Sequence, residues 1–219
     1  MKTRLAICGA GGFGREVAVM IAQINQHQPM WNVIGFFDDH KKTTEPIDGL
    51  PVLGNIDQIN HHLLKLSICI AVADPVVRAS IVRRITNPAI DFPAIIHPSA
   101  ILGDENRNSV GAGTIITAGV ILTTGIAISE FCIVNLASTI GHDVNLGSYC
   151  TIMPGCSISG NVSIGQQSLM GTGSRILQGI TIGENCIIGA GSVVTKSFGE
   201  NLKLLGVPAR KRIHHVERI

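Results

Sequence analysis

Residues 139–162 read TIGHDV NLGSYC TIMPGC SISGNV, four six-residue units that share one pattern. In each unit the second residue is aliphatic and the sixth is small or β-branched. Steps of six from Val110 to Val194 meet an aliphatic residue every time. Such a hexapeptide repeat is typical of a parallel β-helix, in which three units form one coil. The repeat predicts about five coils, stacked at the usual strand spacing into a prism about 25 Å tall.

The composition agrees with a narrow prism. The chain has 25 glycines among 219 residues but only six Phe, one Trp and one Tyr. Four cysteines occupy the small inward position of a unit: Cys132, Cys150, Cys156 and Cys186. The remaining Cys8 and Cys69 lie in apolar runs, and no C-x-x-C or Cys/His spacing typical of zinc is present. We therefore expect buried thiols, with neither a metal site nor a disulfide framework.

The charge pattern excludes several classes of protein. Lys and Arg number 17 and Asp and Glu 15, a net charge of +2 without the basic clustering that nucleic acids select. The uncharged stretch 109–129 is interrupted by Gly and Thr and is a poor membrane span. The N-terminus lacks a secretory pattern. We expect a cytoplasmic chain that binds neither nucleic acid nor a membrane.

Residues 1–93 lack the repeat and alternate between apolar strands and amphipathic helices. Strands are predicted at 4–8, 33–37 and 68–73, and helices at 15–26, 56–66 and 75–86. This βαβαβα order is typical of a parallel sheet that binds ligands at the carboxyl ends of its strands.

The first predicted strand is followed by the glycine loop GAGGFG, residues 9–14. Such a loop lets a diphosphate approach a helix N-terminus, and Asp38 and Asp39 follow at a distance suited to a ribose or a base. The motif alone would also fit a nicotinamide-dependent oxidoreductase. However, 93 residues supply only one mononucleotide half, and a β-helix follows it. A nucleoside diphosphate site is therefore favoured over dinucleotide redox chemistry or a purely structural turn.

Both halves together resemble the bacterial sugar acyltransferase family that includes sialic acid O-acetyltransferases and UDP-4-amino-sugar N-acetyltransferases. The residues that carry the resemblance are GAGGFGREV at 9–17, FFDD at 36–39, Asn135, IGHD at 140–143, MPG at 153–155, SGNV at 159–162 and GVPA at 206–209. The resemblance implies a left-handed β-helix, a homotrimer, and acetyl-CoA bound between neighbouring prisms. The expected domains are a Rossmann-like unit at 1–93, an acyltransferase β-helix at 94–200 and a capping tail at 201–219.

His142 stands out from the residues themselves. It is the only histidine in the repeat, and it occupies the third place of its unit, which faces away from the core. Gly160 lies one coil later and should leave a hollow above it. Histidine is the common general base near neutral pH, and the adjacent Asp143 can orient an imidazole. The alternative interpretation of His142 is a solvated surface residue.

Carried over by position, the resemblance implies His142 as the general base, Asp143 as its acidic partner and Asn135 as a polar active-site residue. It places acetyl-CoA beside Gly160, Thr172, Ala190 and Lys196. It assigns the nucleotide end of the acceptor to Gly11, Gly12, Phe13, Asp38 and Asp39. Arg78 can contact a phosphate, although an exposed helical arginine is an equal interpretation.

The favoured function is N-acetylation of a UDP- or dTDP-linked amino sugar for a bacterial surface glycan. The alternatives are O-acetylation of sialic acid or a related sugar, and a non-catalytic trimeric scaffold that binds nucleotide sugars. Phe13 and Thr151 stand where UDP-amino-sugar enzymes often carry histidine, and Ala73-Asp74-Pro75 also departs from the family pattern, so the acceptor stays open. A γ-class carbonic anhydrase is disfavoured because its zinc needs three histidines.

Overall fold

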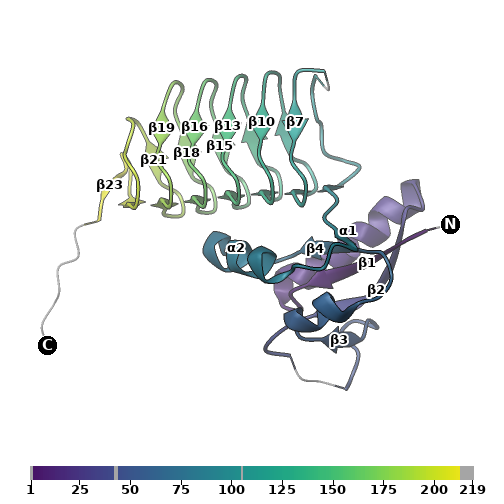
Figure 1. The fold of residues 1–219 in the computed structure, drawn as a ribbon. Helices are drawn as coiled ribbons and strands as arrows, with labels where there is room; N and C mark the ends of the chain where they lie inside the picture. The colour runs from purple at the N-terminus through teal and green to yellow at the C-terminus, as the bar shows by residue number, and fades with distance from the viewer. Residues whose placement is uncertain (1, 42–43, 105, 213–219) are drawn as a thin grey trace, which may run out of the picture.

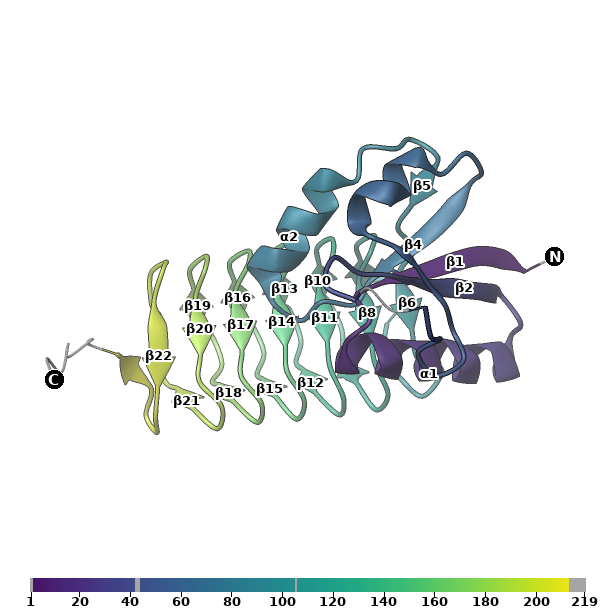
Figure 2. The same ribbon diagram turned by 90° about the horizontal axis from the view of Figure 1, so that it is seen from below.

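The computed structural model describes residues 2–41, 44–104 and 106–212. An N-terminal α/β unit lies along one side of a long β-prism, beside its first coils (Figures 1 and 2). Its strands are β1 (Thr3–Cys8), β2 (Trp31–Phe37), β3 (Val52–Gly54), β4 (Leu66–Ile70) and β5 (Ile90–Asp91), and its helices are α1 (Gly12–His27), the 3₁₀ helix η1 (Ile56–His61) and α2 (Pro75–Arg84). The sheet is parallel with the order β3-β2-β1-β4-β5.

The predicted alternation is confirmed, with two differences. The short edge strands β3 and β5 were not expected, and the helix predicted over 56–66 is only the 3₁₀ helix η1. Leu63 is 95% exposed, so the apolar spacing that suggested a longer helix is not buried. The Asn87 side chain donates to the carbonyls of Ile59 and His62, which ends the helical turn there.

The prism is built from two-residue strands separated by tight turns. They are β6 (Ile95–Ile96), β7 (Ser109–Val110), β8 (Ile115–Ile116), β9 (Ile121–Leu122), β10 (Ala127–Ile128), β11 (Ile133–Val134), β12 (Thr139–Ile140), β13 (Asn145–Leu146), β14 (Thr151–Ile152), β15 (Ser157–Ile158), β16 (Ser163–Ile164), β17 (Leu169–Met170), β18 (Arg175–Ile176), β19 (Thr181–Ile182), β20 (Ile187–Ile188), β21 (Val193–Val194), β22 (Lys203–Leu205) and β23 (Arg210–Lys211). Ala127 pairs in parallel with Asn145, which confirms a coil of 18 residues.

The three sides of the prism are three sheets. One has eight strands and holds β6, β8, β11, β14, β17, β20, β22 and β23; the β9–β21 sheet has the order β21-β18-β15-β12-β9, and the β7–β19 sheet has the order β19-β16-β13-β10-β7. The repeated aliphatic positions from Ile116 to Val194 are at most 3% exposed. All six cysteines are buried free thiols, as predicted, and burial raises the pKa of Cys69 to about 12.

Residues 203–211 cover the last coil of the prism. β22 continues the eight-stranded sheet beside β20, and Leu204 and Ala209 are fully buried against the last coil. Residues 213–219 of the predicted capping tail lie outside the described residues. No helix within the described ranges is long and apolar enough to cross a bilayer.

The α/β unit packs on the eight-stranded sheet of the prism. Ile95, Ile115 and Ile133 belong to one buried cluster with α1 and β1, through side chains such as Val17 and Leu5. The other face of the α/β sheet is covered by η1 and α2. The α/β unit and the prism are therefore joined by an apolar seam.

Candidate active site

His142 lies in the turn between β12 and β13 and forms a pair with the next residue. Its Nδ1 is 2.9 Å from Oδ2 of Asp143, and both side chains are about half exposed. A carboxylate can only accept, so Nδ1 carries the proton of a neutral imidazole. The lone pair then resides on Nε2, where it can take a proton from a substrate. Asp143 has a φ of 58°, a left-handed conformation that short polar residues tolerate.

Gly160 lies one coil above His142 and packs directly against the imidazole. A Cβ atom at Gly160 would be 2.3 Å from Nε2 of His142 and 2.5 Å from Cε1. The N–H of Asn161 also donates to the His142 carbonyl, at 2.7 Å. The hollow expected at Gly160 is therefore present, and the imidazole itself fills it.

The glycine loop opens α1 as predicted. Gly9 has a φ of 103°, and a Cβ at Gly14 would collide with the Gly9 carbonyl, so both glycines are needed for the turn itself. Gly11 and Gly12 instead face open space, with nothing within 4 Å of an added Cβ. These two positions leave the N-terminus of α1 accessible to a ligand.

Asp38 and Asp39 line a cavity of about 340 Å³ at the carboxyl ends of β1, β2 and β4. Both carboxylates are also bonded within the chain. Asp38 accepts from the N–H groups of Ala10 and His40, each at 2.8 Å. Asp39 forms a 2.6 Å ion pair with Arg84, which holds the pKa of the Asp39 carboxyl below its usual range. Sequence reasoning missed Arg84 because 45 residues separate it from its partner.

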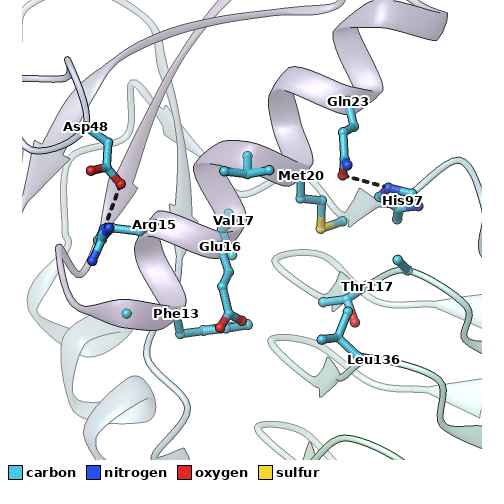
Figure 3. Close-up of a pocket in the computed structure, with 13 residues that line it drawn as sticks. Phe13, Arg15, Glu16, Val17, Met20, Gln23, Asp48, His97, Thr117 and Leu136 are labelled. Atoms are coloured by element: carbon cyan, nitrogen blue, oxygen red, sulfur yellow. Dashed lines mark hydrogen bonds and ion pairs between the residues drawn. The ribbon is translucent and has the colours of Figure 1, made fainter.

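A larger cavity, about 570 Å³, lies between α1 and the prism. Phe13, Glu16 and Met20 line it from α1, and Thr117 and Leu136 line it from the turns of the prism (Figure 3). Sequence reasoning did not single out Glu16, Met20 or Leu136. Glu16 and Met20 are ordinary residues of a predicted amphipathic helix, and Leu136 lies in a turn of the repeat, so none of the three carried a separate signal.

Asn135 supports one wall of this cavity. Its side chain is 6% exposed, and its Oδ1 accepts from the N–H of Leu136 at 2.8 Å and from the Thr117 hydroxyl at 3.3 Å. Asn135 thus holds Thr117 and Leu136, which line the same cavity as Phe13.

His97 closes the far end of the 570 Å³ cavity (Figure 3). Its Nδ1 accepts the Ser99 N–H, so its Nε2 carries the proton and donates to Oε1 of Gln23 at 3.0 Å. Burial, with a smaller contribution from His27, lowers the pKa of His97.

The residues expected at the acetyl-transfer site form two rows on the prism. The first row lies in turns between the eight-stranded sheet and the β9–β21 sheet, and consists of Asn135, Thr172 and Ala190. The second row lies in turns that follow the β9–β21 sheet, and consists of His142, Gly160 and Lys196. One whole side of the prism separates the rows, and His142 does not line the 570 Å³ cavity. A single chain therefore does not bring His142 to Asn135 or Phe13.

Arg78 differs from its expected role as a phosphate contact. Its side chain is fully buried, and its guanidinium donates to oxygens of the α/β unit and the prism. A phosphate in solvent cannot reach these donors. The interpretation of Arg78 as a substrate-binding residue is therefore corrected by the structure.

Two family profiles match parts of the chain, one in the α/β unit and one in the prism. Residues 4–85 match the PglD N-terminal domain, and residues 161–196 match the hexapeptide repeat of succinyl-transferase. A stretch of 142 residues is 31% identical to GDP-perosamine N-acetyltransferase of Escherichia coli O157:H7. It covers 64% of this chain and 63% of that enzyme, which is less than two thirds of the relative's length.

The whole chain is similar to the acetyltransferase domain of PglB from Neisseria gonorrhoeae, solved in complex with acetyl coenzyme A. The TM-score is 0.88 at 30% identity, covering 97% of this chain and 100% of that one. The chain belongs to the hexapeptide sugar N-acetyltransferases. Its prism is accordingly the left-handed β-helix of these acetyltransferases, as the resemblance implied.

The chain is also similar in structure to a perosamine N-acetyltransferase. PerB from Caulobacter crescentus, in complex with CoA and GDP-perosamine, has a TM-score of 0.84 at 26% identity and covers 95% of this chain and 96% of that one. Further structures of the Caulobacter enzyme carry asparagine or alanine in place of one histidine.

Proposed function

We propose that the protein transfers the acetyl group of acetyl-CoA to the amino group of a nucleotide-linked amino sugar, with His142 as the general base. The observation that carries this proposal is the exposed His142–Asp143 pair, whose free Nε2 packs over Gly160. The relatives that bind acetyl-CoA, CoA and GDP-perosamine support the same pair of substrates. Such substrates favour a cytoplasmic role in building a surface glycan.

In the proposed reaction, the sugar amine attacks the thioester carbonyl while Nε2 of His142 takes the amine proton. The Asp143 carboxylate stabilises the imidazolium that results. Backbone N–H groups, including that of Gly160, would hold the oxyanion of the tetrahedral intermediate. Its collapse breaks the carbon–sulfur bond, and the imidazolium returns a proton to the CoA sulfur. The products are the acetamido sugar and free CoA.

The separation of the two rows supports an active site formed between two chains. The second row of one chain would supply His142. The first row of its neighbour would supply Asn135 and the adjoining 570 Å³ cavity, where the acceptor sugar would bind. Acetyl-CoA would lie in the groove between them, beside Gly160 and Lys196 of one prism and Thr172 and Ala190 of the other. A closed trimer repeats such a head-to-tail contact three times.

Mixed oligomers test this arrangement. His142→Ala and Asn135→Ala should each be nearly inactive alone, because every site then lacks one group. Random mixing of the two variants in one oligomer should restore about a quarter of wild-type activity, since one neighbouring pair in four joins an intact second row to an intact first row. The measurement is turnover after co-expression. Mixed oligomers as inactive as the parents would mean that each site lies within one chain.

A thiol-release assay tests the reaction and its acceptor. We expect CoA release with a GDP-, UDP- or dTDP-linked 4-amino sugar and little release with free or CMP-linked sialic acid. We expect the GDP-linked sugar to be the best acceptor, because one relative is a GDP-perosamine N-acetyltransferase and another was solved with GDP-perosamine. CoA release with sialic acid and with no amino sugar would mean that the protein is an O-acetyltransferase and not an N-acetyltransferase. No release with any acceptor, although acetyl-CoA binds, would contradict the proposed acceptor class.

A further inference from the structure

Arg78 lies where α2 meets the prism, and its side chain is fully buried. Its Nη1 donates to the carbonyls of Val72 and Ala73, at 2.6 and 3.1 Å. The remaining partners belong to the prism: the Phe131 carbonyl at 2.8 Å, the Tyr149 carbonyl at 2.7 Å, the Cys150 carbonyl at 3.2 Å and the Thr151 hydroxyl at 2.8 Å. We propose that Arg78 is a positioning residue that fixes the acceptor-binding edge of the α/β unit on the acetyl-transfer prism.

The chemistry of these contacts favours a specific role over general packing. None of the six oxygens is a carboxylate, so within the described residues no carboxylate accepts a hydrogen bond from the buried guanidinium. Burial of a charge is costly unless every donor is satisfied. The planar guanidinium of Arg78 uses all five of its N–H groups in these contacts. Desolvation lowers the pKa of Arg78 to about 10, which is still above neutral pH, so the guanidinium remains charged there.

The contacts reach the acceptor site through the segment that follows β4. Arg78 holds the carbonyls of Val72 and Ala73, and Val72 lines the 340 Å³ cavity with Asp38 and Asp39. The glycine loop rests on the same segment, because a Cβ at Gly9 would be 2.9 Å from the Ala71 carbonyl. Displacement of this segment would therefore move both the cavity and the loop.

Thr151 of the prism adds to the contacts of Arg78, and we call the hydrogen bonds that these two residues make to the segment after β4 the clamp. Its hydroxyl accepts from Arg78 and donates to the Ala73 carbonyl at 2.7 Å, and its side chain is fully buried. Thr151 thus joins the two halves of the molecule.

A second attachment lies at the other end of the seam, where His97 bonds Gln23 of α1. Without Arg78, the α/β unit would stay tethered by this bond and by the apolar cluster around Ile115 and Ile133. We therefore expect the unit to pivot rather than detach. Acetyl-CoA binding, which the proposed function places on the prism alone, should be preserved.

The test compares Arg78→Met and Thr151→Val with Arg83→Met, which removes an exposed arginine from the same helix. Arg78→Met should raise the acceptor KM about 10- to 100-fold, the range typical of a misplaced binding group, with the Kd for acetyl-CoA unchanged. Thr151→Val, which keeps the side-chain shape, should give a smaller rise. Arg83→Met should match the wild type.

Hydrogen exchange provides a second readout that does not depend on activity. The inference rests on the proposed function for its kinetic part, but faster exchange at the amides of residues 71–78 in Arg78→Met or Thr151→Val would support the clamp even if no acetyl transfer were found. Wild-type exchange and wild-type acceptor KM in both folded variants would overturn it. An equal rise in acetyl-CoA Kd would also overturn it, because a general loss of folding would then explain the effect.

Discussion

His142→Ala should lower kcat by about 10²- to 10⁴-fold while acetyl-CoA still binds, because the variant lacks only the group that takes the amine proton. His142 is half exposed and contributes nothing to the prism core, so the fold should be unaffected. Steady-state kinetics with the best acceptor from the thiol-release assay measures the loss. Calorimetric binding of acetyl-CoA checks that the substrate site is intact.

His61→Ala provides the matched control, since His61 is an exposed histidine at the end of η1, far along the chain from the prism. It should retain wild-type kcat. Asp143→Asn should cost less than His142→Ala, because the amide fits the left-handed backbone but no longer fixes the tautomer. Wild-type kcat in His142→Ala would remove His142 from the mechanism.

Gly160→Ala should lower kcat by about 100-fold through a single added methyl group. The new Cβ would lie 2.3 Å from Nε2 of His142, so the imidazole must swing away from its position beside Asp143. Gly160 is not among the residues with a positive φ, so its backbone accepts alanine without strain. The predicted loss therefore comes from displacement of the base and not from unfolding.

Gly199→Ala separates this effect from alanine substitution in general. Gly199 also lies in the β-helix with no positive φ, and nothing lies within 4 Å of an added Cβ. It should keep wild-type kcat and thermal stability. A Gly160→Ala enzyme as active as Gly199→Ala would show that the imidazole does not need its place over Gly160.

Some corrections came from contacts between distant parts of the chain. The helix predicted over 56–66 is only the 3₁₀ helix η1. The Asn87 side chain donates to the carbonyls of Ile59 and His62, which a longer helix would have used for its own hydrogen bonds. The sequence indicated only a phosphate contact or an exposed helical arginine for Arg78, since its partners at Phe131 and Tyr149 lie 53 and 71 residues away. Likewise, the ion pair of Asp39 with Arg84 has no local signal.

The hexapeptide period alone predicts the β-helix, its 18-residue coil, the burial of the four cysteines in the repeat and the stacking of Gly160 on His142. Each of these depends on a strict period, which assigns every residue to a side of the prism before any distant contact is known. Contacts between distant residues alone decide that Arg78 joins the two halves, and where the cavities lined by Phe13 and by Asp38 and Asp39 open. These features depend on how the α/β unit packs against the prism through Ile115 and Ile133, and no repeat in the chain specifies that packing.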